Sequence, residues 1–135
     1  MAAAPKVLDS YALLAFFEDE PGADQVHDLL VQAEKSNEKL LMTVVNLGEV
    51  WYSIARGYSE ATAEAKLREI REMAIEIVDA DWNLTRQAAA FKAKGKIAYA
   101  DCFAAALATQ RKAQLVTGDP EFRLVEDGVE ILWIR

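Results

Sequence analysis

Short runs of consecutive apolar residues, separated by stretches long enough for helices, most strongly constrain the fold of this chain. Residues 40–44 (Leu-Leu-Met-Thr-Val) and 131–134 (Ile-Leu-Trp-Ile) are clear examples. Strands of this kind fit a sheet that is covered on both faces. Because strands and helices alternate, the sequence predicts an α/β protein, a three-layer α/β/α sandwich with a short, mostly parallel central sheet. The expected strands cover 6–9, 39–44, 75–79, 114–117 and 130–134, and the expected helices cover 11–18, 22–35, 46–56, 60–73, 81–94, 100–112 and 120–124.

Length and composition limit the classes of protein that the chain can encode. Its 135 residues suffice for one domain, expected over 1–135, that buries roughly two-thirds of the surface of the unfolded chain. Hydrophobic residues make up 53% and charged residues 27%, a balance typical of soluble globular proteins. The sequence shows neither an apolar stretch that could cross a bilayer nor a secretory signal, so we expect a cytoplasmic protein without membrane association.

The acidic balance of the chain constrains how it could bind a polyanion. Its formal net charge is −7 at pH 7, which disfavours binding of nucleic acid over a broad basic surface. A polyanion would have to be attracted locally, and a bound cation in an acidic cleft would reverse the potential there. Lys92, Lys94 and Lys96 form the densest basic run, for which a solvated helix end is the simpler interpretation.

Four carboxylates, Asp9, Glu49, Asp101 and Asp119, stand where one predicted element gives way to the next. Asp9 and Asp119 each follow an apolar strand, and open α/β sheets bind ligands at the edge where the strands end. Thr117 adds a hydroxyl at that edge, which could orient a carboxylate or a metal-bound water. Oxygen ligands without His or Cys suit Mg²⁺ or Mn²⁺, which also bind phosphate oxygens. These residues predict metal-dependent phosphodiester chemistry.

Each acid also has a purely structural interpretation. Asp9, Asp101 and Asp119 lie at predicted helix starts, where a carboxylate accepts free backbone N–H groups and is favoured by the helix dipole. Glu49 lies at the margin of an apolar helix face, and Gly48 leaves room beside it for a backbone or a ligand. Independent caps have no reason to converge, so the functional interpretation requires that all four acids meet at one edge of the sheet.

Four blocks of sequence, taken in order, resemble the PIN-domain ribonucleases, and among these the VapC toxins. The likeness spans nearly the whole chain, and the Asp-Ser and Thr-Gly-Asp blocks are its most specific parts. The Pro-Glu pair at 120–121 departs from it, because many relatives carry a basic or less acidic pair there. The blocks are 7–10 (Val-Leu-Asp-Ser), 44–50 (Val-Val-Asn-Leu-Gly-Glu-Val), 100–106 (Ala-Asp-Cys-Phe-Ala-Ala-Ala) and 115–122 (Leu-Val-Thr-Gly-Asp-Pro-Glu-Phe).

The resemblance implies a PIN fold, Mg²⁺- or Mn²⁺-dependent endoribonuclease activity on RNA, and inhibition by a cognate VapB-type antitoxin. It also points to a homodimer. In that family the position matching Thr117 supports an acidic metal site. The acids of that site match Asp9, Glu49, Asp101 and Asp119.

The mechanism expected from these residues is hydrolysis of RNA by a water that a metal ion activates. Asp9 and Asp101 are expected to make the most direct metal contacts, while Glu49 and Asp119 complete the coordination directly or through water. His27, the only histidine, lies outside these blocks, so a carboxylate would have to orient the attacking water.

Two rival interpretations stay open. A Mg²⁺-dependent phosphatase or phosphoacceptor domain also places acids at strand ends, but such sites pair two acids in one motif, and Asp9 has no acidic neighbour. A non-catalytic PIN-like binding module would instead use its acids to receive basic side chains from a partner peptide.

Overall fold

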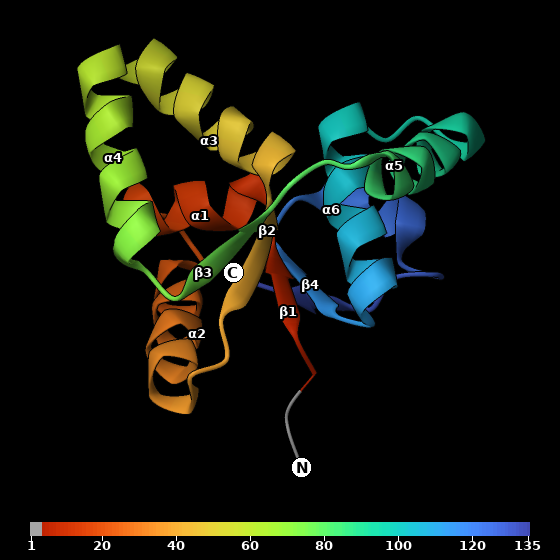
Figure 1. Ribbon diagram of the computed structural model, residues 1–135, viewed down its shortest axis with the longest axis horizontal. Helices are drawn as coiled ribbons and strands as arrows, with labels where there is room; N and C mark the ends of the chain where they lie inside the picture. The colour runs from red at the N-terminus through yellow and green to blue at the C-terminus, as the bar shows by residue number, and fades with distance from the viewer. Residues whose placement is uncertain (1–3) are drawn as a thin grey trace.

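The computed structural model describes residues 4–135 and contains every predicted strand and helix (Figure 1). Its five strands form one sheet in the order β3-β2-β1-β4-β5, and every neighbouring pair is parallel. The predicted α/β/α fold is therefore confirmed, with a sheet that is parallel throughout. The strands are β1 (Lys6–Leu8), β2 (Leu40–Thr43), β3 (Ile75–Val78), β4 (Gln114–Thr117) and β5 (Ile131–Trp133).

The start of α3 shows the largest shift from the predicted element boundaries. The β-branched pair Val44 and Val45 favours a strand, yet α3 begins at Val44, directly after β2. The hydroxyl of Thr43 accepts the backbone N–H of Asn46 at 3.0 Å, and this N-cap starts the helix early. The helices are α1 (Ser10–Phe17), α2 (Ala23–Ser36), α3 (Val44–Gly57), α4 (Glu60–Glu72), α5 (Trp82–Lys94), α6 (Tyr99–Arg111) and the 3₁₀ helix η1 (Pro120–Val125).

Helices cover both faces of the sheet, because alternate residues of each strand point to opposite sides. Val7 and Leu115 pack in one core with residues of α5, α6 and η1. Leu8 and Val116 pack in the other with residues of α1, α2, α3 and α4. Figure 1 shows these two groups of helices on either side of the strands. The alanines of α6 are fully or almost fully buried between Asp101 and Thr109, since small side chains let this helix lie close to the sheet.

Because all strands run the same way, their carboxyl ends meet at one edge of the sheet. Three helices begin there directly after a strand: α1 after β1, α3 after β2 and η1 after β4. The positive ends of their dipoles point toward that edge. Within residues 4–135, no helix combines the length and the apolar character needed to cross a membrane.

Candidate metal centre

Asp9 connects the end of β1 to the start of α1 and is only 1% exposed. Its Oδ1 accepts the backbone N–H of Ala12 at 2.8 Å, so Asp9 is the N-cap of α1. Its Oδ2 accepts a hydrogen bond from the hydroxyl of Thr117 at the end of β4. The structural interpretation of Asp9 as a cap is therefore correct, and the bond from Thr117 adds a link between two strands that a cap does not require.

Thr117 also positions Asp119, because its Oγ1 accepts the backbone N–H of Asp119 at 3.0 Å. Asp119 caps η1, where its Oδ1 accepts the backbone N–H of Glu121 at 2.9 Å. One hydroxyl thus touches the loop that carries Asp119 and the carboxylate of Asp9. The Thr117 hydroxyl at the strand end thus orients a carboxylate, that of Asp9.

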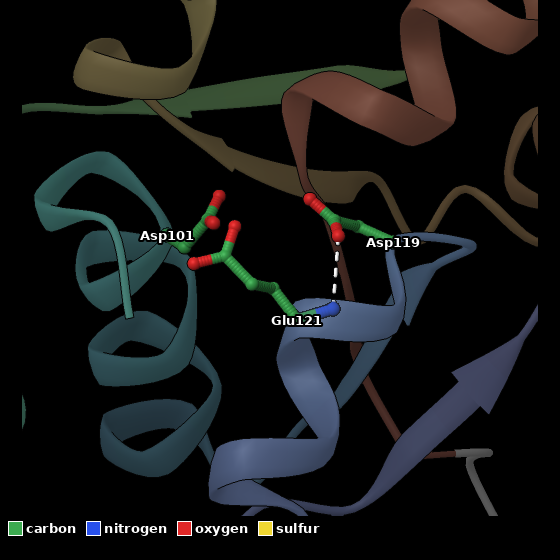
Figure 2. Close-up of side chains that lie close together, drawn as sticks. All are labelled: Asp101, Asp119 and Glu121. Atoms are coloured by element: carbon green, nitrogen blue, oxygen red, sulfur yellow. Dashed lines mark hydrogen bonds between the residues drawn. The ribbon is translucent and has the colours of Figure 1, made fainter. Parts of the chain in front are cut away.

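Asp101 lies in the first turn of α6 and is 7% exposed. Ala98, not Asp101, is the N-cap residue of that helix, so the capping interpretation is wrong for Asp101. One carboxylate oxygen from each of Asp101, Asp119 and Glu121 lies within 4.8 Å of the other two. Figure 2 shows Asp101 and Glu121 pointing toward one another from α6 and η1. This group does not include Asp9 or Glu49.

Glu49 reaches the same edge from α3 and is half-buried. Its Oε1 accepts hydrogen bonds from the hydroxyl of Ser10 at 2.8 Å and from the side-chain amide of Asn46 at 3.3 Å. Ser10 follows Asp9 directly, so these bonds hold Glu49 beside the start of α1. A Cβ at Gly48 would meet no atom within 4 Å, so the expected close approach of another backbone there is not found.

The structure adds two residues that sequence reasoning does not assign to the site. In the sequence Glu121 stands out only as a departure from the family pattern, although a tight turn after Asp119 is a signal that residue 121 lies close by. Asn46 belongs to the same sequence block as Glu49 without a role of its own, although its burial in an otherwise apolar stretch indicates bonded polar partners. We call Asp9, Glu49, Asp101, Asp119 and Glu121 the edge acids.

Two of the edge acids, Asp9 and Asp101, are harder to ionise than ordinary aspartates. Burial is the largest cause and raises the pKa of Asp9 to about 8, although hydrogen bonds from Thr117 and Ala12 favour its ionised form. Burial also raises the pKa of Asp101 to about 7. Neighbouring charges raise both values further; they come from Asp101 and Asp119 for Asp9, and from Asp119, Glu49 and Glu121 for Asp101.

Among residues 4–135, no basic side chain forms an ion pair with an edge acid. In the part of the chain that the structure describes, the ion pairs join His27 to Asp28, Lys66 to Glu69, and Arg111 to Glu76, and none includes an edge acid. The basic run before Asp101 is a helix end: Lys92 and Lys94 lie in the last turn of α5, and Lys92 Nζ donates to the Ile97 carbonyl at 2.9 Å. A cation placed among the edge acids would favour their ionised forms, and five carboxylates with no nitrogen or sulfur donor fit a hard divalent ion.

Several solved structures share this fold, with sequence identities that support a likeness of fold alone. The VapBC2 structure from Rickettsia felis, bound to a promoter DNA fragment, matches with TM-score 0.75 and 18% identity, covering 96% of this chain and 98% of that chain. DNA-bound VapBC from Salmonella typhimurium matches with TM-score 0.71 and 14% identity, covering 96% of this chain and 98% of that chain. VapC20 from Mycobacterium tuberculosis, described as a sarcin-ricin loop cleaving toxin, matches with TM-score 0.65 and 12% identity, covering 92% of this chain and 95% of that chain.

No curated protein matches the chain significantly in sequence. The model of the PIN domain family, in contrast, matches residues 6–128, from the first residue of β1 to the loop after η1. This range includes all the edge acids and Thr117. The resemblance inferred from the four sequence blocks is thereby confirmed, and the chain belongs to the PIN domain family.

Proposed function

We propose that this protein is a metal-dependent endoribonuclease that hydrolyses RNA phosphodiester bonds, and the toxin of a VapBC-type toxin–antitoxin pair. The observation that carries the proposal is the convergence of the edge acids on the carboxyl edge of one parallel sheet. They come from the β1–α1 junction, α3, α6, the β4–η1 connection and η1. RNA as the substrate is supported by the shared fold of VapC20, a sarcin-ricin loop cleaving toxin.

In this proposal Asp101, Asp119 and Glu121 hold Mg²⁺ or Mn²⁺, since their oxygens lie within 4.8 Å of one another. Asp9 and Glu49 complete the coordination directly or through water. A bound divalent ion supplies Lewis-acid polarisation of a phosphate oxygen and a water of lowered pKa.

The chain itself would orient the carboxylates of the site. Hydrogen bonds from Ala12 and Thr117 hold the Asp9 carboxylate, and bonds from Ser10 and Asn46 to Oε1 hold Glu49. Such preorganisation lowers the cost of gathering charge around a reacting phosphate. The Glu49 Oε2 is left to accept a hydrogen bond from an attacking water.

The decisive experiment is cleavage of single-stranded RNA by the purified protein with Mg²⁺, with Mn²⁺ and with a chelator. Cleavage should require the metal and disappear in Asp101→Asn. Asp81→Asn is the matched control, because Asp81 caps α5 through Leu84 N at 2.9 Å and is not an edge acid. Full activity of Asp101→Asn, or cleavage in chelator, would contradict the proposal. Release of phosphate from small phosphoesters with RNA intact would favour a phosphatase, and metal binding without cleavage a binding module.

The proposed protein partners are a VapB-like antitoxin and a second copy of the chain. The proposed location is the cytoplasm, where the RNA substrate is found. VapBC complexes among the solved structures of this fold support the antitoxin. An acidic edge in a chain of net charge −7 would attract the basic side chains of such a partner.

Expression of the chain alone should arrest growth, and co-expression of a neighbouring antitoxin gene should restore it. Light scattering of the purified chain tests the homodimer; a monomeric mass would remove that part of the proposal.

A further inference from the structure

Asn46 has a side chain whose hydrogen-bonding groups all have partners, and it is 0% exposed. Its Oδ1 accepts a hydrogen bond from the Thr43 hydroxyl at 2.6 Å. Its Nδ2 donates to Glu49 Oε1 at 3.3 Å and to the backbone carbonyl of Ala100 at 3.2 Å. One amide therefore contacts an edge acid on its own helix and the backbone of a second helix, α6.

The orientation of this amide follows from its partners. The Thr43 Oγ1 already accepts the Asn46 backbone N–H at 3.0 Å, so its own hydrogen is available for Asn46 Oδ1. The carbonyl of Ala100 has no hydrogen to give, and neither has an ionised Glu49. A flipped amide would place Oδ1 against both acceptors, so only the observed orientation satisfies the whole group.

The bond to Ala100 joins the two layers of helices across the carboxyl edge of the sheet. α3 packs in the core that contains Leu8 and Val116, while α6 packs in the core that contains Val7 and Leu115. Ala100 directly precedes Asp101, so Asn46 connects the helix that carries Glu49 to the residue before Asp101. Glu49 and Asp101 both carry carboxylates, and like charges repel each other. A neutral double donor between them opposes their separation.

We propose that Asn46 is a positioning residue that holds Glu49 and Asp101 close enough to serve one divalent ion, an inference that rests on the metal site of the proposed function. Asn46 acts through the two carboxylates and touches neither metal nor substrate. Groups that orient metal ligands typically change metal affinity or activity by roughly 10- to 100-fold when they are removed.

The test is Mn²⁺ affinity, measured by titration calorimetry on the metal-free full chain, for the wild type and Asn46→Val. The variant removes both donors with little change in volume, and its Mn²⁺ affinity should be roughly 10- to 100-fold weaker. Ser59→Ala is the control for a general loss of stability. Ser59 caps α4 by accepting the N–H of Thr62 at 3.0 Å and lies outside the edge acids, so this variant should melt earlier and bind Mn²⁺ as the wild type does.

Asn46 bridges α3 and α6 by bonding both Glu49 and the Ala100 carbonyl. Ser10→Ala tests whether this bridge matters beyond the hydrogen bond to Glu49 alone. Ser10 donates the shorter hydrogen bond to Glu49, at 2.8 Å, but has no bond to α6. If the bridge to Ala100 matters, Ser10→Ala loses less Mn²⁺ affinity than Asn46→Val. An equal or larger loss in Ser10→Ala would overturn the bridging role.

A double-mutant cycle with Glu49→Gln tests whether Asn46 acts through Glu49. The loss caused by Asn46→Val should shrink in the Glu49→Gln background, because the carboxylate that Asn46 positions has gone. If Asn46→Val weakens Mn²⁺ binding by the same factor in both backgrounds, the role of Asn46 is merely structural.

The possible failures are distinguishable. Tight Mn²⁺ binding by the wild type and equally tight binding by Asn46→Val would overturn this inference and leave the metal site standing. Absence of Mn²⁺ binding by the wild type would remove both. If Asn46→Val does not fold, Asn46→Ser decides in its place, because serine keeps at most one donor and fills less of the buried space. Wild-type affinity in Asn46→Ser would overturn the inference.

Discussion

The two edges of the sheet differ in charge, because the amino edge mixes basic and acidic side chains whereas the carboxyl edge gathers acids. At the amino edge Lys6, Lys39 and Arg111 line a groove of about 690 Å³ together with Glu38 and Glu76. There Arg111 lies 3.7 Å from Glu76, and Lys6 Nζ donates to a backbone carbonyl at 3.3 Å. At the carboxyl edge the edge acids have no basic partner among the described residues.

Helix dipoles explain the sign of the charge at each edge but not the accumulation of acids. Helices begin at the carboxyl edge, where acids are favoured, and α2 and α6 end near the amino edge, where cations are favoured. If helix dipoles and capping hydrogen bonds alone explained why acids gather at the carboxyl edge, the pKa values of these acids would be lowered. Instead the pKa values of Asp9 and Asp101 are raised to about 8 and about 7. Burial is the largest cause of both shifts, and the charges of neighbouring acids add to it. Carboxylates with pKa values perturbed in this way cluster at functional sites.

The largest expected effect distinguishes the two edges by metal binding. Glu121→Gln removes a carboxylate of the 4.8 Å group and should weaken Mn²⁺ binding by more than about 10-fold, with loss of RNA cleavage. Glu38→Gln removes an acid of the amino-edge groove and should leave both properties unchanged. Titration calorimetry and a gel-based cleavage assay measure the two quantities. Equal losses in both variants would mean that the edges do not differ in function.

The next prediction concerns stability against pH in metal-free buffer. Asp9 and Asp101 have pKa values far above the ordinary 3.8 in the folded protein, so the folded state holds protons that the unfolded chain has released. The free energy of unfolding should therefore fall as pH rises from about 4 to about 8, and level off above the folded pKa values. Denaturant titrations across this range measure it.

Asp9→Asn isolates the contribution of the carboxyl edge to this pH dependence. An asparagine carries no charge, so the variant should lose much of the slope and be at least as stable as the wild type at pH 8. Asp81→Asn, at a cap outside the edge acids, should keep the wild-type slope. A strong loss of stability in Asp9→Asn at pH 8 would mean that its role as a cap outweighs the cost of the buried charge.

Two glycines near the edge acids should respond to alanine with opposite signs. A Cβ at Gly118 would overlap the ring of Tyr11 and lie 3.1 Å from the Ile134 carbonyl, so Gly118→Ala should destabilise by about 1–3 kcal/mol. Gly48 lies within α3, and a Cβ there would have no neighbouring atom within 4 Å, so Gly48→Ala should stabilise by about 0.5–1 kcal/mol. Thermal unfolding measures both; a stable Gly118→Ala would show that Tyr11 moves freely.

The smallest effect is expected at the amino edge. Arg111→Gln breaks an ion pair in which both partners are about half exposed, and exposed pairs contribute about 0–1 kcal/mol. Its melting temperature and Mn²⁺ affinity should stay close to those of the wild type. A large change in Mn²⁺ affinity would mean that the two edges are coupled through α6, which carries Arg111 and Asp101 at its ends.

Local sequence was enough to predict the elements and part of the site. Apolar runs such as residues 40–43 and helical stretches such as 60–72 depend on neighbours along the chain, and all of them form as predicted. Asp9 and Asp119 could be assigned to the edge because each follows a strand, and parallel strands bring their ends together. Where local signals conflicted, at Val44 and Val45, the Thr43 cap decided the boundary.

Only the tertiary structure decided how the acids are grouped. Asp101 joins Asp119 and Glu121 because α6 packs beside η1, and Asn46 reaches Ala100, 54 residues away, because two helices from opposite faces meet over the sheet edge. The raised pKa values also depend on burial and on charges from distant segments. Periodicity and capping are properties of neighbouring residues and can be read from the chain, whereas distances between side chains far apart in sequence are set by how whole helices pack.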